Sequence, residues 1–282
     1  MRSDFRPLLC AVLLIASAQA MEAQAIARLS SQPPLSPPEV AELETRVQSE
    51  PGDIATRSRL LTHYRDYMNP VFRAVRLRHI LYLIEHSPAS DVAASALAYV
   101  YASGGPYADA ADHELARNAW LRAADANRTD ASVQVNAARF LYVEHPDDAE
   151  ELLRRLVEQE PSNRVLASHL GFFYAMDILG MNGPFGTRGR RPSEAERLGA
   201  QARGELERTT NPLVLAAAAT ALPNLFMRSR ARRAPGGDPT VFQYSSTLMA
   251  RARQLAPGEP ELRGPMPLIR EFGQLTGSES DR

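Results

Sequence analysis

The sequence predicts an all-α protein, a right-handed solenoid of about five to six stacked helical hairpins behind an N-terminal export signal. Three observations lead to this fold class. Apolar side chains recur every three or four residues, which places them on one face of a helix. Short turn sequences recur at intervals in the thirties, as in helical repeat arrays. Finally, no segment has the alternating, β-branched pattern of a strand.

The first 20 residues have the features of a secretory signal peptide. Arg2 and Arg6 supply the positive start, residues 8–16 form a short apolar run, and Ala18-Gln19-Ala20 matches the small-x-small cleavage pattern. The apolar run is shorter than the roughly 20 residues that a membrane-spanning helix needs. We therefore expect cleavage near residue 20, a periplasmic or secreted mature chain and no membrane span in it. Retention of the segment as an N-terminal anchor is the alternative.

Residues 21–38 are expected to form a flexible linker, because the stretch is proline-rich and lacks apolar periodicity. The Ser36-Pro37-Pro38-Glu39 sequence then predicts a helix start, with serine as the cap and proline and glutamate in the first turn. The folded repeat domain is predicted to cover residues 39–275. Residues 276–282 are expected to be a disordered tail.

Composition excludes several functional classes. The formal net charge is −1, whereas a dedicated nucleic-acid-binding domain is usually strongly basic. The only cysteine, Cys10, lies inside the expected signal peptide, so the mature chain would lack disulfides, thiolate metal sites and a cysteine nucleophile. The chain contains no lysine, and all 32 Lys+Arg positions are arginine, which is typical of a GC-rich genome.

Turn sequences divide the body of the chain into units. From Pro51 to Pro88, Asn127 and Pro161 the spacing is 37, 39 and 34 residues, and two longer intervals follow. Each turn stands between two segments of helical periodicity. The expected helices are 39–50, 54–68, 71–86, 91–103, 108–126, 131–144, 147–159, 163–179, 193–209, 212–228, 240–255 and 261–275.

A recurring side-chain pattern lies within these units. A large residue, a small residue and an aromatic residue share one helix face, and the small residue lets a partner helix approach closely. Examples are Leu97, Ala98 and Tyr101, then Leu170, Gly171 and Tyr174, while Leu60, Leu61 and Tyr64 have the same spacing with a leucine in the middle. With Ala149 in a second helix and Pro161 closing a unit of 34 residues, the pattern resembles the tetratricopeptide repeat. The resemblance is best over residues 132–174 and extends loosely over 39–275. It departs from the family in two long insertions and in the missing tryptophan near the start of each unit, since Trp120 falls in a second helix.

Two arginine-rich insertions are the first candidate site. They interrupt their units at 179–192 and 228–239, both between a first and a second helix, so the solenoid predicts that they are neighbours. Seven arginines would then converge, and their forked donors suit phosphate, sulfate or carboxylate groups. These are Arg188, Arg190, Arg191, Arg228, Arg230, Arg232 and Arg233. The alternative is that the insertions are solvated and serve no binding role.

Other polar motifs predict no chemistry. His113-Glu114-Leu115-Ala116-Arg117 begins like a zinc-protease helix, but Arg117 replaces the second histidine, so no metal site and no cofactor are expected. Glu150 and Glu151 open an acidic helix and are expected to pair with Arg154 and Arg155 four residues on, a catalytic carboxylate pair being the less favoured interpretation. The aromatic residues of the middle units are expected in the core, with Tyr107 or Tyr142 as candidates to line a groove.

The predicted function is therefore an exported protein-interaction scaffold, not an enzyme. Stacked hairpins form a concave face that can hold a peptide or a partner protein. An anion- or glycan-binding protein, or an envelope enzyme that uses the arginine-rich insertions, is the alternative. The sequence does not identify the partner.

Overall fold

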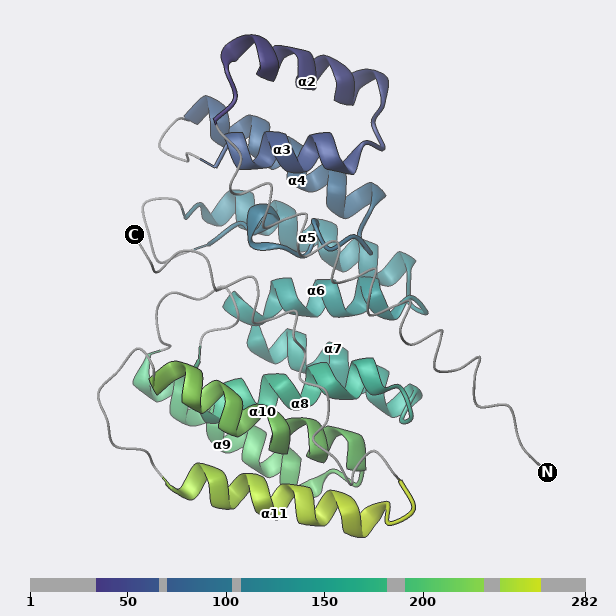
Figure 1. The fold of residues 1–282 in the computed structure, drawn as a ribbon, viewed down its shortest axis with the longest axis vertical. Coiled ribbons are helices and arrows are strands. Elements are labelled where there is room, and N and C mark those ends of the chain that lie inside the picture. Colours follow the sequence, from purple (N-terminus) through teal and green to yellow (C-terminus); the bar gives the residue numbers. More distant parts are fainter. Residues whose placement is uncertain (1–33, 66–69, 103–107, 182–190, 231–238, 260–282) are drawn as a thin grey trace, which may run out of the picture. The chain divides into compact units, whose positions relative to one another are not determined.

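The computed structural model describes residues 34–65, 70–102, 108–181, 191–230 and 239–259 (Figure 1). These residues form ten α-helices and one 3₁₀ turn and contain no strand, which confirms the all-α prediction for them. The expected signal peptide, most of the linker, the 261–275 helix and the tail lie outside the described residues. None of the described helices is both long enough and apolar enough to cross a bilayer.

The chain divides into two compact units, with the boundary inside α5, after Trp120. The described helices of the first unit are α2 (Pro37–Ser49), α3 (Ile54–His63), α4 (Pro70–His86) and the greater part of α5 (Ala110–Ala126). Those of the second unit are α6 (Ala131–Glu144), α7 (Pro146–Gln159), α8 (Arg164–Ile178), α9 (Pro192–Arg208), α10 (Pro212–Arg230) and α11 (Pro239–Leu255). Within each unit, helices pack largely in consecutive pairs.

The recurring turn sequences have a common structural role, which is to cap the next helix. Asp53, Asp130, Asn163 and Asn211 precede α3, α6, α8 and α10, and each side chain accepts hydrogen bonds from the first turn of its helix. Such caps satisfy backbone N–H groups that otherwise have no partner in the helix. The turn signal read from the sequence therefore marks four helix starts.

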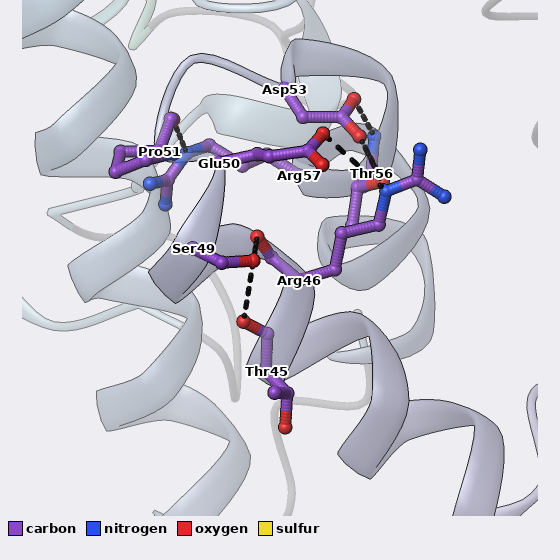
Figure 2. Close-up of polar contacts among 8 residues, drawn as sticks. All are labelled: Thr45, Arg46, Ser49, Glu50, Pro51, Asp53, Thr56 and Arg57. Atoms are coloured by element: carbon purple, nitrogen blue, oxygen red, sulfur yellow. Dashed lines mark hydrogen bonds and ion pairs between the residues drawn. The ribbon is translucent and has the colours of Figure 1, made fainter.

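Figure 2 shows this arrangement at the turn between α2 and α3. Asp53 accepts from the Thr56 N–H at 2.9 Å and from the Thr56 hydroxyl at 2.7 Å. Arg46 of α2 lies 3.1 Å from the Asp53 carboxylate, and Arg57 of α3 donates to the Pro51 carbonyl at 3.0 Å. Side chains from both helices thus fix the turn that joins them.

The start of α2 also matches the sequence. Ser36 and Glu39 form a capping box, in which the Glu39 carboxylate accepts from the Ser36 backbone N–H at 2.7 Å. Two prolines occupy the first turn, so the helix begins at Pro37, two residues before the expected start at 39.

One expected helix is absent. Residues 91–103 were predicted to be helical, but their described part is irregular apart from the 3₁₀ turn η1 (Ala96–Ala98). Ser90 and Ser95 hydrogen-bond to backbone carbonyls three residues earlier, an alternative that competes with helix formation. In addition, Arg76 of α4 donates to the Leu97 and Tyr99 carbonyls, at 2.6 and 3.1 Å. A buried side chain thereby uses acceptors that a helix would need.

The second unit is built around the contact of α8 with α10 (Figure 1). Gly171 of α8 lies so close to α10 that a Cβ atom there would be 2.6 Å from the Ala217 Cβ. The predicted role of a small residue at this position is therefore confirmed. Helix α8 ends in a Schellman motif, with Gly180 at φ +64° and the Met181 N–H bonded to the Met176 carbonyl at 2.9 Å.

Helix α11 packs against α10 at an internal proline. Pro223 has no N–H and cannot donate to the Ala219 carbonyl one turn earlier. The Ser245 hydroxyl of α11 donates to that carbonyl instead, at 2.6 Å. The missing helical hydrogen bond is thus replaced by a bond between the two helices.

Candidate functional site

A cavity of about 350 Å³ in the second unit is the candidate site. It lies among α7, α8, the end of α9 and the start of α10. Its lining combines apolar side chains with charged and hydroxyl-bearing ones. The lining residues are Arg154, Val157, Glu158, Pro161, Leu170, Tyr174, Glu205, Arg208, Thr209, Thr210, Asn211 and Val214. Ligand sites of proteins typically have this mixed character and a volume of at least about 300 Å³.

Hydrogen bonds between turns fix one wall of the cavity. Asn211 caps α10 through its Oδ1 atom, and its Nδ2 donates to the Pro161 carbonyl at 2.9 Å. Arg251 of α11 donates to the Leu206 and Thr209 carbonyls, at 2.7 and 2.8 Å. It thereby supplies hydrogen-bond donors to carbonyl groups at the C-terminal end of α9, which lack a partner within the helix. The wall is therefore held by hydrogen bonds from side chains to backbone carbonyls.

The floor of the cavity is apolar. Val157 of α7, Leu170 of α8 and Val214 of α10 are buried side chains that line it, and the ring of Tyr174 lies with them. These residues belong to three helices that pack against one another around α8. The floor is therefore formed by side chains that belong to the core of this unit.

Charged residues surround this floor in two helical pairs. Arg154 and Glu158 lie one turn apart on α7, and Glu205 and Arg208 lie on the last turn of α9. Arg208 contacts Glu205 at 2.5 Å, and Arg154 contacts Glu151 on its own helix. Both arginines thus already have a carboxylate partner, and Glu158, whose charge also acts on Arg154, is exposed at the edge of the cavity.

Further carboxylates lie behind the cavity. Glu150 is only 5% exposed and accepts a hydrogen bond from Gln201 of α9 at 3.3 Å. Burial raises the pKa of Glu150 to about 7, and the nearby charges of Asp177 and Glu205 add to the shift. Burial also raises the pKa of Tyr174, with Glu150 and Glu205 acting in the same direction. Three carboxyl groups, those of Glu150, Asp177 and Glu205, and the guanidinium of Arg154 therefore act on the Tyr174 hydroxyl.

Two sequence predictions are wrong here. Glu151 pairs with Arg154 and Arg155 as expected, but Glu150 points into the unit and bonds Gln201 instead. Seven residues later along α7, Val157 is buried too, so this face of the helix is covered by neighbouring helices. Tyr142 was a candidate groove residue, yet its side chain is fully buried and its hydroxyl donates to Asp177 at 2.6 Å. Tyr107 lies outside the described residues.

The arginine-rich insertions fall mostly outside the described residues. This holds for Arg188, Arg190, Arg232 and Arg233. Arg191 is exposed and directly precedes α9, and Arg228 and Arg230 belong to the last turn of α10. The proposed convergence of these arginines stays a prediction.

The first unit contains a buried polar network, which is the second candidate. Glu44 of α2 accepts from the Tyr64 hydroxyl at 2.8 Å, from His79 Nε2 at 3.0 Å and from Arg78 at 2.8 Å. Arg57 lies 3.1 Å from His79 Nδ1. Burial would raise the pKa of Glu44, but the hydrogen bonds from His79 and Tyr64 outweigh it and lower the pKa.

The protonation of this network follows from its donors. The Arg57 guanidinium can only donate, so His79 accepts at Nδ1 and carries its proton at Nε2, toward Glu44. Burial lowers the pKa of His79, which favours this neutral form. A carboxylate–imidazole pair could serve catalysis, but the side chain of His79 is fully buried and Arg57 lies 3.4 Å above the Tyr82 ring. The network therefore joins α2, α3 and α4.

Sequence reasoning missed the cavity. Its only local signal is the spacing of three or four residues between Arg154, Val157 and Glu158, and again between Glu205 and Arg208, which puts each set on one helix face. Nothing local indicates that the two faces meet. The chain matches no protein-family model, and comparisons with the curated proteins and with the solved structures give no match either.

Proposed function

We propose that this chain is a binding module that holds a peptide segment of a partner protein, with the cavity of the second unit as its docking point. The observation that carries the proposal is an apolar floor, formed by Val157, Leu170 and Val214, beneath a charged rim. A peptide side chain inserted there would bury apolar surface, which is the main favourable term in protein association. The rim would orient the peptide backbone.

The surroundings of the cavity support a preformed site. The wall at 209–211 is tied to Pro161 by Asn211, and the end of α9 is tied to α11 by Arg251. A site on fixed elements loses little conformational entropy on binding. Glu150, the carboxyl group with the pKa near 7, does not line the cavity. This favours peptide binding over acid–base catalysis as the role of the cavity.

The proposal includes the finer architecture and the location. The four helix-capping turns and the close contact at Gly171 support a tetratricopeptide-like solenoid. The signal-like first 20 residues support export to the periplasm or beyond the cell. A solenoid of this kind would present the peptide site to partners in the envelope.

The test is a selection of displayed random 12-residue peptides on the purified protein, paired with a variant that blocks the cavity. Thr210 lies at the cavity, directly before the cap of α10, so Thr210→Trp places an indole there. Thr129 holds the same position before the cap of α6 and does not line the cavity, so Thr129→Trp is the matched control.

We expect enriched peptides that bind the wild type and Thr129→Trp equally but lose at least about tenfold in affinity, or about 1.4 kcal/mol, for Thr210→Trp. Circular dichroism melts of both variants check that they are folded. Absence of enrichment, or equal binding to both variants, would overturn the proposal.

A further inference from the structure

We infer that the cavity takes a cationic side chain, arginine or lysine, from the bound peptide. This inference rests on the proposed function and names the chemical class that the site selects. Its basis is the combination of an apolar floor with carboxylates at the edge and behind the lining, where the arginines already have carboxylate or carbonyl partners.

The charge distribution is the first argument. Of the four charged lining residues, Arg154 and Arg208 are offset by Glu158 and Glu205. Behind the lining lie carboxyl groups that act on the same region, namely Glu150 and Asp177, while Glu151 already pairs with Arg154. Burial is the main cause that raises the pKa of Tyr174, while three carboxyl groups act in the same direction and one arginine opposes them. Because Glu150 has a pKa of about 7, the negative charge behind the floor is greatest above that pH, where it favours a positive ligand group.

The existing ion pairs are the second argument. An acidic peptide would have to displace Glu151 from Arg154, or Glu205 from Arg208, and would meet repulsion from the remaining carboxylates. A cation needs no such exchange, since the Glu158 carboxylate lines the cavity and is exposed to solvent. The pairs thus discriminate against an anion.

The shape of the lining is the third argument. Arginine and lysine carry a long apolar stem with a charged head. The stem would lie on Val157, Leu170 and Val214, and the head would reach the carboxylates of Glu158 and Glu205. The ring of Tyr174 adds an aromatic face, against which a guanidinium packs favourably.

The experiment compares three capped amino acids on the purified protein by ligand-observed NMR titration. The probes are N-acetyl-arginine methylamide, the neutral analogue N-acetyl-citrulline methylamide and N-acetyl-glutamate methylamide. We expect the arginine probe to bind at least about fivefold more tightly than the other two, because one charge pair near a protein surface contributes an affinity difference of about this size. Equal affinity for arginine and citrulline, or a preference for glutamate, would overturn the inference.

Variants assign the binding to the cavity. Glu158→Gln removes one exposed carboxylate and leaves the Arg154–Glu151 and Arg208–Glu205 pairs in place, and it should weaken the arginine probe about two- to fivefold. Glu207→Gln changes an exposed carboxylate of α9 that does not line the cavity, and it should leave the affinity unchanged. Equal effects of the two variants would contradict the inference.

Failure of the inference and failure of the proposed function are distinguishable. Displayed peptides that depend on the cavity but lack a basic residue would sustain the function and overturn the cationic ligand class. Absence of any enriched peptide would overturn the function, and the capped amino acids would still report directly on the ligand class.

Discussion

Gly171 of α8 and Ala217 of α10 lie so close together that a methyl group on the glycine would be 2.6 Å from the alanine Cβ. Two backbone atoms of α10 are equally near, the Ala218 nitrogen and the Val214 oxygen, both at 2.7 Å. The contact is therefore between helix backbones and cannot be relieved by a rotamer change. It sets the separation of the two central helices of the second unit, and both of them line the cavity.

Gly171→Ala should destabilise the protein by about 1–3 kcal/mol, because overpacking outweighs the helix propensity gained. Adding Ala217→Gly should not restore stability, since the two backbone atoms still block the methyl group. The control is Gly204→Ala in α9, where the nearest atom is the end of the flexible Arg208 side chain at 3.4 Å. Chemical denaturation should show this control to be neutral or more stable by up to about 1 kcal/mol. A stabilised Gly171→Ala would refute the close packing.

Ser245→Ala should cost about 1–2 kcal/mol of unfolding free energy, because the Ala219 carbonyl loses the donor that replaces the proline nitrogen. The neighbouring Ser246 is exposed and donates to the Phe242 carbonyl on its own helix. Ser246→Ala should therefore change stability by less than about 0.5 kcal/mol. Urea melts compare the two, and equal effects would rule out a special role for the bond from α11.

Glu44→Ala should destabilise the protein by about 2–4 kcal/mol, since it removes the acceptor of the Tyr64 hydroxyl and of the buried His79 imidazole. The matched control is Glu42→Ala on the exposed side of the same helix, which should change stability by less than about 0.5 kcal/mol. Thermal melts at neutral pH measure both. A small effect of Glu44→Ala would show that the network adds little to the stability of the first unit.

Glu150→Gln should change the pH dependence of stability. The folded-state pKa of about 7 exceeds the ordinary value of 4.5, so the folded state binds the proton more tightly. The stability from Glu150 is thus complete below pH 4.5 and is lost as the pH rises through 7. At pH 8 the variant should be more stable than the wild type by up to about 3 kcal/mol, and near pH 4 the two should be similar.

Denaturation curves from pH 4 to pH 8 measure this difference. Glu158→Gln, at an exposed position on the same helix, controls for the substitution itself. A constant difference between wild type and Glu150→Gln across this range would contradict the burial of the carboxyl group.

The sequence predicted those parts of the fold that depend on local interactions. Helix α6 begins and ends at the predicted residues, because Asp130 caps it and Pro146 follows its end. The segment 91–103 was mispredicted because its Leu97 and Tyr99 carbonyls accept hydrogen bonds from Arg76, which belongs to the preceding helix, α4. The role of Glu150 was missed for the same reason, since Gln201 belongs to α9.

The cavity could not be predicted because it exists only where helices distant in the sequence meet. Its two charged helix faces are separately visible in the sequence, but their meeting depends on how α7 and α9 pack beside α8. The floor depends further on the close approach of α10 at Gly171. The arginine-rich insertions, which composition alone singled out, lie mostly beyond the described residues.

The most direct test of the proposed peptide site is methyl NMR of the isotope-labelled protein, titrated with the strongest peptide from the display selection. We expect the methyl signals of Val157, Leu170 and Val214 to shift most, because these side chains form the floor of the cavity. Val47 and Leu60, in the core of the first unit, should stay unchanged. Shifts that leave the three floor residues unaffected and appear elsewhere would contradict the account.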